Sequence, residues 1–507
     1  MQATTSSAPD NTGAPANAQR VLVTLVIVAA VANLPLAMAN VALPSIGKYF
    51  NASQIQLNLV AVAYSLGLAC SVLWLGALGD RYGRKQMAII GVSLAIPAAL
   101  VSGFAPSINV LILARLFGGF TAGMAYPTTL ALIAALWGPG AARTRAIAMW
   151  AALGGAISVS GPLLAGIILN IAAWPWVFFI VIPLAVVALF MAMRNIPAHV
   201  NETTEKVDNL GGILSVILVG AFVLSLNFLP IAQYRTSAMA LLLFSVVVAV
   251  LFVIRQRRAE SPLYDLKIAA RPTFWVAAVA GIIIFGSLMG AMFIGQQYMQ
   301  DVLGLGTVQA AIPALFAGAC MIVVAPRSAK MVEEIGSRAT LLRGYIFILV
   351  AFLIMLFFWK EGTSFWVVAL AFMFVGVGIG LSGTPASRSL TGSVPVMKAG
   401  MASGTADLQR DLGGAIFNSL FGALLAAGYA AAMTAAIAAY PADTIPPAAV
   451  SGLTMSYAGA QTVAAEYPQY ATQITAAAQQ SFLAGDQQAY IAGILAVLIG
   501  AARMPAM

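Results

Sequence analysis

The chain is dominated by apolar runs, most of them about twenty residues long or longer, with short polar segments between them. A helix needs about 20 mainly apolar residues to cross the hydrocarbon core of a membrane, which is about 30 Å thick. Only 8% of the 507 residues are charged, whereas about 25% are charged in soluble domains. The sequence therefore predicts an all-α polytopic membrane protein.

Fourteen runs, bounded by charged residues, Pro and Gly, are candidates for spanning helices. They are 21–43, 55–78, 86–106, 109–134, 144–170, 174–193, 210–231, 236–254, 273–295, 309–326, 340–358, 365–386, 404–430 and 484–502. The run at 309–326 gives the weakest signal. The first run is too long for the apolar part of a signal peptide, so we interpret it as a retained helix.

The positions of the basic residues predict the orientation of these spans. If the N-terminus is cytoplasmic, 20 of the 25 Lys and Arg residues fall in inner segments and two fall within spans. The three in outer segments are Lys48, Arg235 and Lys360. Cytoplasmic loops carry an excess of Lys and Arg. We therefore expect a multi-pass protein of the cell inner (plasma) membrane with both termini cytoplasmic.

A repeated loop divides the chain into two halves. GALGDRYGRK (76–85) follows the second predicted span, and APRSAKMVEEIGSR (325–338) follows the tenth. Aligning Gly83 with Gly336 also aligns Asp80 with Glu333 and Lys85 with Arg338. Many secondary transporters are built from such repeats, with the substrate site between them.

The repeat predicts two six-helix halves, with two additional helices inserted between them. The expected parts are a disordered cytoplasmic tail (1–20), an N-terminal half (21–193), a cytoplasmic loop (194–209), two inserted spans (210–254), a second cytoplasmic loop (255–272) and a C-terminal half (273–507) with an external loop at 431–483.

Three motifs carry more information than apolar patterning. In the first inner loop, Gly76 and Gly83 permit a tight turn, and Asp80, Arg81 and Arg84 are expected to form charge contacts that hold the halves together. The stretch LARLFGGFTAGMAYP (113–127) places Arg115 inside a span. An Arg in a membrane span is costly unless it is paired or reaches the membrane surface, so it marks a functional site unless it extends outward to water.

The third motif is GGAISVSGPLLAG (154–166), in the fifth predicted span. Its glycines, Gly154, Gly161 and Gly166, permit close approach of a neighbouring helix, and Pro162 bends the helix. Glycine-rich packing is common in membrane helices. The Gly-Pro pair in this span, after the two preceding motifs, is more specific.

Together these motifs resemble the 14-span drug:proton antiporter family of the major facilitator superfamily, and the resemblance covers roughly residues 20–430. It implies the major facilitator fold and proton-driven export by alternating access. The sequence departs from the family pattern at Pro35, where an Asp is usual in the first span, and at WPWVFFIVIP (174–183), which lacks the usual Arg and Asn.

The stretch GTADLQRDLGG (404–414) places three charges inside the thirteenth predicted span. Counted from Lys398, Asp407 lies about 13 Å and Asp411 about 20 Å along the helix, at about 1.5 Å per residue. Their spacing of four residues places both on one face of the helix. Gly413 and Gly414 leave room there for a neighbouring helix or a substrate.

Elimination favours these two acids as the proton carriers. The only acids among residues 1–200 are Asp10 and Asp80, both outside the predicted spans, and Asp486 is expected at the outer edge of the last span, within reach of water. We predict proton coupling by Asp411 first and Asp407 second, with Arg410 as the partner that tunes them. In the alternative interpretation, Arg410 pairs structurally with Asp407 and leaves Asp411 free.

The predicted function is export of lipophilic, cationic drugs or toxic compounds. A carboxylate suits cationic substrates, and Asn33, Asn40 and Tyr64 are candidates for the cavity wall, although helix packing alone would also explain them. The expected partners are a small-molecule substrate, protons and the lipid bilayer. We expect a monomer that binds no nucleic acid.

Two other functions remain open. One is a dedicated exporter of a single endogenous metabolite or lipid, and the other is a transport-deficient membrane sensor or scaffold. No nucleophile–base cluster, metal-ligand spacing or phosphate-binding loop is visible in the segments outside the spans, so we expect neither an enzyme nor a bound metal or cofactor.

Overall fold

The computed structural model describes residues 15, 17–138, 141–198, 206–229, 231–392, 399–439 and 445–502. Every regular element in these ranges is helical. The helices are α1 (Ala18–Phe50), α2 (Gln54–Tyr82), α3 (Arg84–Gly103), α4 (Ile108–Leu136), α5 (Ala141–Ile171), α6 (Trp176–Phe179), α7 (Val181–Asn195), α8 (Asn209–Phe228), η1 (Ala232–Tyr234), α9 (Arg235–Arg258), α10 (Leu266–Ala269), α11 (Pro272–Gln297), the π-helix η2 (Tyr298–Val302), α12 (Thr307–Phe358), α13 (Phe365–Gly392), α14 (Ala399–Ala438), α15 (Pro447–Met455), α16 (Tyr457–Glu466), η4 (Pro468–Tyr470) and α17 (Ala471–Ala502).

Twelve helices of the described chain are long and apolar enough to cross a membrane. Fourteen spans therefore remain a prediction. Two helices bear on the difference between fourteen and twelve spans. Helix α5 has 31 residues, but its described part does not meet the criterion of length and hydropathy for a span. Helix α12 has 52 residues with a break at Gly336. A straight helix of that length would measure about 78 Å, more than twice the hydrocarbon core.

The repeated loop has the same backbone feature in both halves. Gly83 lies between α2 and α3 with φ 111°, and Gly336 lies at the break in α12 with φ 85°. Residues with a Cβ rarely adopt this region. The glycines that the sequence aligned are therefore the ones that turn the chain between consecutive helices.

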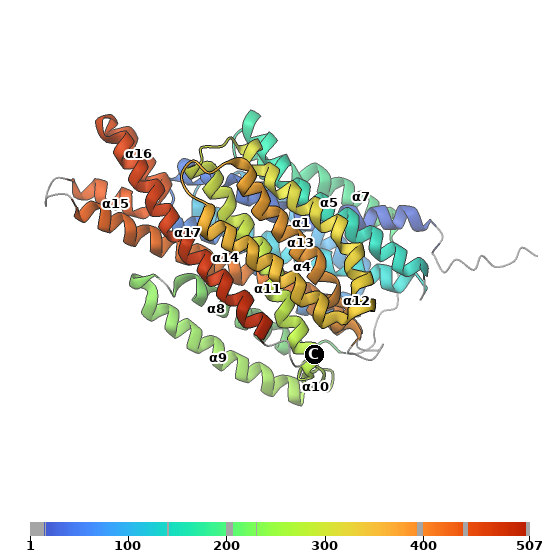
Figure 1. Cartoon of the computed structure of the whole chain (residues 1–507). Coiled ribbons are helices and arrows are strands. Elements are labelled where there is room, and N and C mark those ends of the chain that lie inside the picture. The colour runs from blue at the N-terminus through green and yellow to red at the C-terminus, as the bar shows by residue number, and fades with distance from the viewer. Residues whose placement is uncertain are drawn as a thin grey trace, which may run out of the picture.

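The pair α8 and α9 lies along one side of the bundle (Figure 1). Helix α8 packs against α2 and α14, whereas α9 packs mainly against α8. Only 17% of the most apolar window of α9 is buried, compared with 78% for α2. This placement agrees with two helices added to the outside of a bundle, and the apolar surface of α9 faces the lipid.

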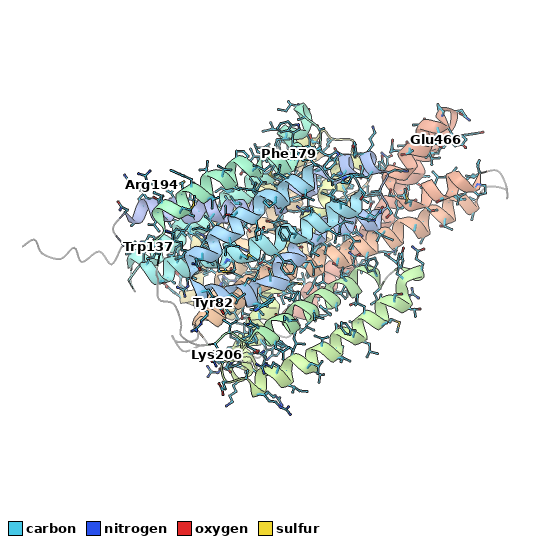
Figure 2. The ribbon with its side chains drawn as sticks, turned by 180° about the vertical axis from the view of Figure 1, so that it is seen from behind. Tyr82, Trp137, Phe179, Arg194, Lys206 and Glu466 are labelled. Carbon is cyan, nitrogen blue, oxygen red and sulfur yellow. The ribbon has the colours of Figure 1, made fainter. Side chains whose placement is uncertain are left out.

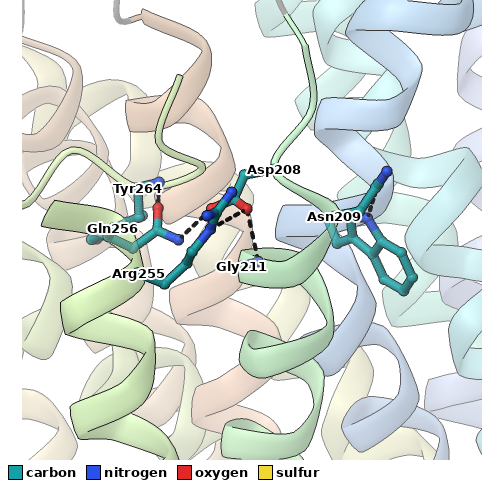
Figure 3. A network of polar contacts seen from close by, with 7 residues as sticks. Asp208, Asn209, Gly211, Arg255, Gln256 and Tyr264 are labelled. Carbon is teal, nitrogen blue, oxygen red and sulfur yellow. Dashed lines mark hydrogen bonds and ion pairs between the residues drawn. The ribbon is translucent and has the colours of Figure 1, made fainter. Parts of the chain in front are cut away.

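A polar network fixes the α8–α9 pair at the end where α8 begins (Figure 3). The buried Asp208 carboxylate accepts hydrogen bonds from the Gly211 backbone N–H, from Arg255 Nε at 2.9 Å and from Gln256 Nε2 at 3.0 Å. Gln256 Oε1 in turn accepts from the Tyr264 N–H at 2.9 Å. Asp208 thus caps α8 and joins it to α9.

The two ends of the bundle are distinct in Figure 2, where Arg194 and Trp137 lie at one end and Glu466 lies at the other. The placement of 194–209 and 431–483 on opposite sides of the membrane remains a prediction. The segment 431–483 differs from the expected loop because it is largely helical: α14 extends to Ala438, α15 and α16 follow, and α17 begins at Ala471.

The predicted boundaries differ slightly at the N-terminus. Helix α1 begins at Ala18, three residues before the predicted start of the first span. Most of the tail predicted at 1–20 lies outside the described residues.

Replacing Gly336 with Ala should reduce stability. The backbone at this position, with φ 85° and ψ 163°, is one that residues other than Gly adopt at a cost of about 1–3 kcal/mol. An added Cβ would meet no atom within 4 Å, so the whole effect would come from backbone strain. Thermal unfolding in detergent, followed by tryptophan fluorescence, measures it.

Gly76→Ala is the matched control. Gly76 is also open to an added Cβ, but it lies inside α2, where Ala is favoured over Gly by about 0.5–1 kcal/mol. Equal losses of stability in the two variants would contradict the assignment of Gly336 as the turning residue.

Candidate substrate cavity and its charged residues

A cavity of about 280 Å³ lies between the two halves. Its wall is formed by α1, α2, α4 and α5 of the first half and by α11, α12, α13 and α14 of the second half. Ligand sites in transporters built from repeats lie at this kind of interface. The cavity is therefore the candidate substrate site.

The wall of the cavity is mainly apolar, with few polar groups. Its large apolar side chains include Trp150, Phe285, Met289, Met292 and Met321. Its polar side chains are Asn33, Ser65, Tyr126, Arg410 and Asp411. Flexible methionines adapt to ligands of different shape, and a few polar groups fix orientation.

Arg410 and Asp411 form a charged pair on this wall. Arg410 Nε lies 3.4 Å from Asp411 Oδ1. The same guanidinium donates to the Tyr126 hydroxyl and lies over the Tyr126 ring, 4.2 Å from its centre. Asp411 Oδ2 is buried and has no hydrogen-bond partner. The carboxylate is thus held by one long contact and keeps one oxygen free beside the cavity.

The structure contradicts the alternative pairing of Arg410 with Asp407. Among the described side chains, Arg410 forms its ion pair with Asp411, the adjacent residue, rather than with Asp407. Asp407 is buried and does not line the cavity. The arrangement places Asp411, but not Asp407, where a substrate can contact it.

Glycines bring the helices around the cavity close together. A Cβ on Gly413 would lie 2.4 Å from the Ile282 carbonyl oxygen of α11, and one on Gly414 would lie 3.1 Å from Met289. Gly413 therefore serves helix packing, while Gly414 lies on the cavity wall.

The glycines of the third motif have the same role on α5. A Cβ on Gly161 would lie 3.0 Å from the Ala37 side chain of α1, and one on Gly166 would lie 2.7 Å from the Thr307 carbonyl oxygen of α12. Both glycines therefore lie at contacts between helices, as expected. Pro162 is within α5 and buried, whereas the surroundings of Gly154 lie outside the described side chains.

Arg115 is fully enclosed, with 2% of its surface exposed, so the interpretation in which it extends outward to water is wrong. Its Nε donates to the Val60 carbonyl at 3.0 Å, and its Nη1 donates to the Pro35 carbonyl at 3.0 Å. The guanidinium also lies 5.0 Å from the ring centre of Tyr64 and 5.8 Å from that of Phe178. Backbone oxygens and ring faces thus surround a cation that has no carboxylate partner among the described residues.

A second, smaller cavity of about 30 Å³ adjoins Arg115. Pro35 and Tyr64 line this cavity, and the Tyr64 hydroxyl donates to the Ala32 carbonyl at 2.6 Å. Of the three residues proposed for the substrate wall, Asn33 lines the central cavity. Tyr64 lines the smaller one instead, and Asn40 is buried in α1 and lines neither.

Arg84 and Lys85 of the inner-loop motif form contacts within the first half. Arg84 Nη2 lies 2.8 Å from Asp80 Oδ1, and Arg84 Nη1 donates to the Ala131 carbonyl of α4. Lys85 donates to the Met193 carbonyl of α7. Contacts that cross to the start of α14 would involve side chains outside the described set, so the role of Asp80 and Arg81 in joining the halves remains a prediction.

The halves do contact each other at the opposite, predicted outer end. Among the described residues, four hydrogen bonds join them there: Gln54 Nε2 to Gln297 Oε1 (2.8 Å), Gln300 Nε2 to the Val41 carbonyl (3.1 Å), Thr307 Oγ1 to the Gly166 carbonyl (3.0 Å) and Ser456 Oγ to the Ala52 carbonyl (3.0 Å). These contacts hold that end of the bundle closed.

The sequence predicted that Asp486 lies within reach of water, and the structure overturns this expectation because Asp486 is only 1% exposed.

No separate role was predicted from the sequence for Tyr126 or Trp150. Tyr126 lies in the same motif as Arg115, and its position three turns further along the helix places it against Arg410.

No group of three or more His, Cys, Asp and Glu side chains within the described ranges is arranged to hold a metal ion. The charged groups of the central cavity can instead bind a proton or an organic cation.

Comparison with known proteins gives consistent results. The model of the Major Facilitator Superfamily matches residues 25–418. The chain is 31% identical over 378 residues to multidrug resistance protein Stp of Mycobacterium tuberculosis, which covers 74% of this chain and 70% of Stp. It is 28% identical over 499 residues to multidrug efflux pump LfrA of Mycolicibacterium smegmatis, covering 97% of each.

Among solved structures, the chain resembles a bacterial homologue of the human lysosomal transporter Spinster in an inward-facing, unoccupied conformation. The TM-score is 0.65 at 15% sequence identity, covering 96% of this chain and 97% of the other. At this identity the likeness establishes the fold alone.

Pro35→Asp should supply Arg115 with the carboxylate that it lacks, because Pro35 and Arg115 line the same small cavity. We expect the variant to unfold a few degrees higher than Pro35→Asn, since a charge-assisted hydrogen bond contributes about 1.5–3 kcal/mol. In an Arg115→Met background the order should reverse, because the new carboxylate would be buried without a cation. Thermal unfolding of the four variants in detergent measures the coupling between positions 35 and 115. Additive effects of the substitutions would contradict the proximity of these two side chains.

Proposed function

The chain belongs to the Major Facilitator Superfamily, and on that premise we propose that it is a proton-coupled antiporter that exports lipophilic, cationic compounds by alternating access. It is a multi-pass membrane transporter and not an enzyme. The proposal concerns the coupling ion, the direction of transport and the substrate class.

The names of the relatives support drug export. Stp is named a multidrug resistance protein and LfrA a multidrug efflux pump. The cavity wall agrees with substrates of this kind, since it combines Trp150 and Phe285 with several methionines and one charged pair. Aromatic faces attract organic cations, and methionines adapt to different shapes.

The observation that carries the proposal is the position of Asp411. Its carboxyl group is buried on the wall of the cavity between the halves, with one free oxygen and one long contact to Arg410. A buried carboxylate loses its hydration, which favours binding of a proton. A cation that enters the cavity favours the ionised form instead. Proton and substrate would therefore compete for the same group, which is the requirement for antiport.

The expected cycle depends on the contacts at the predicted outer end and on the membrane potential. The hydrogen bonds at the predicted outer end correspond to a state that is open toward the cytoplasm or closed at both ends. Export requires those contacts to open after the substrate binds. The membrane potential contributes about 2.3 kcal/mol per proton for each 100 mV.

The decisive experiment measures efflux of a fluorescent lipophilic cation such as ethidium from liposomes that contain the purified protein, with an imposed pH gradient. Asp411→Asn should reduce gradient-driven flux at least about tenfold, equivalent to about 1.4 kcal/mol. Asp407→Asn should have a smaller effect because Asp407 does not line the cavity. Glu361→Gln, at an exposed loop position, is the control.

Full gradient-driven flux in both aspartate variants would overturn the assignment of the proton carrier. Flux of a single endogenous metabolite or lipid, without flux of several unrelated cations, would favour a dedicated exporter. Absence of any flux from the wild-type protein, tested with several dyes, would favour a sensor or scaffold.

A further inference from the structure

The C-terminal half contains a further buried carboxylate, which the mechanism above does not use. Asp486 lies on α17 and is 1% exposed. The Tyr490 hydroxyl donates to its Oδ2 at 3.3 Å, while its Oδ1 is buried without any hydrogen-bond partner. Burying an ionised carboxylate in this way is costly unless other groups compensate the charge.

Asp301 lies on an element that packs against α17, the helix that carries Asp486. It is in the π-helix η2, at the end of α11. Single π-turns are rare and frequently mark functional positions. Two carboxylates near each other cannot both be ionised without repulsion. The described part of the chain forms no ion pair between either carboxylate and a basic residue.

Several of the described side chains near Asp486 are aromatic. The Tyr298 ring stacks on Trp359 with centres 4.7 Å apart, and Trp359 meets the Tyr490 ring edge-on at 5.8 Å. The Trp359 indole N–H is buried without a partner. The titratable or charged groups nearby, apart from the acids, are Tyr298, Tyr429, Tyr457, Tyr490 and the exposed Lys360, whose carbonyl accepts from Tyr298.

The phenols of this cluster do not change charge in the physiological range. Phenols normally lose their proton near pH 10, and burial raises the pKa of Tyr457 in α16 to about 12. Tyrosines therefore stay neutral donors between pH 5 and 8. The ionisation state of this cluster depends on its two acids.

The cluster adjoins the contacts that close the predicted outer end. Gln297, which bonds Gln54 of the first half, directly precedes η2. Gln300, which bonds the Val41 carbonyl of the first half, lies within η2 and directly precedes Asp301. A change in the conformation of η2 would therefore affect both contacts directly, without involving the central cavity.

We propose that Asp486, together with Asp301, forms a proton-binding site that keeps the predicted outer end closed while it is protonated and lets it open when it ionises. Ionisation would release the proton to water at the outer side and leave an unpartnered, repelled charge among aromatic side chains, and opening would hydrate that charge. A proton taken from the outer side would then restore closure. The inference deepens the proposed proton-coupled export and rests on it.

A proton fits this site better than a metal ion does. Metal ions need several oxygen ligands, and the residues described provide no group of three or more acidic, His or Cys side chains for one. Asp486 has one oxygen without a hydrogen-bond partner, which suits a protonated acid. The Trp359 N–H also has no partner, and it is a neutral donor.

The test measures the opening of the predicted outer end directly. Spin labels at Lys48→Cys and Glu361→Cys, both exposed and in opposite halves, report its width in a protein whose Cys70 and Cys320 are replaced by Ala. We expect the long-distance population to rise at least about threefold between pH 5.5 and pH 8 in lipid nanodiscs without substrate. Asp486→Asn should remain mostly at the short distance at both pH values, and Asp486→Glu should restore the response.

Asp411→Asn separates this site from the central one, because it should abolish dye flux yet keep the pH-dependent distance change. If Asp486→Asn responds to pH as the parent protein does, the inference is wrong. A distance change that depends on sodium at constant pH, measured against N-methylglucamine, would also overturn it. If the wild-type protein transports no dye but opens in an Asp486-dependent manner, the proposed function fails and the proton site stands.

Discussion

A charge buried within the bundle must be compensated by the protein itself, because the hydrocarbon around it supplies neither water nor hydrogen-bond partners. The ionisable groups in the middle of this chain are arranged by that constraint. Arg115 is surrounded by two backbone carbonyls and two aromatic rings, and Arg410 is held by Asp411 and Tyr126. Neither arrangement is a symmetric, fully hydrogen-bonded ion pair. Each leaves a buried polar atom without a partner.

The two halves meet this constraint differently. In the first half, Arg115 is a buried cation without a carboxylate partner among the described residues, and Pro35 contributes a backbone carbonyl to it at the position where the family resemblance predicted an Asp. The second half holds acids at two levels: Asp411 at the central cavity and Asp486 with Asp301 near the predicted outer end. The acids that we propose to bind protons thus lie in the C-terminal half, while the N-terminal half supplies a buried positive charge and part of the cavity wall.

Small residues determine where the halves touch. Gly166 allows the start of α12 to pack against α5 of the other half, whereas Gly413 allows α11 and α14 to pack closely within the C-terminal half. The hydrogen bonds at the predicted outer end lie at the same boundary and are few, which suits a contact that must open and close during transport. The α8–α9 pair is different, because Asp208, Arg255 and Gln256 join its helices firmly to each other.

Periodicity, charge bias and the two aligned glycines were sufficient to predict a helical membrane protein made of two related halves, because span length and turn geometry are local properties. Single motifs also identified Arg115 and Asp411 as buried charges, since a charge in an apolar run is visible without a structure. Partners were not predictable in this way. Arg410 bonds Asp411 rather than Asp407 because Tyr126 of α4 holds the guanidinium on that side, and a contact between residues 284 positions apart leaves no mark on either segment.

The sequence by itself predicted a helical membrane protein and showed which charged residues fall in apolar runs, because both follow from local hydropathy. Only the tertiary structure decided which charges meet. Asp486 illustrates the difference: its place near the start of an apolar run suggested access to water, but α17 begins at Ala471, so the residue lies well inside a long helix packed against α14. Burial depends on neighbouring helices, and their arrangement is a property of the whole bundle.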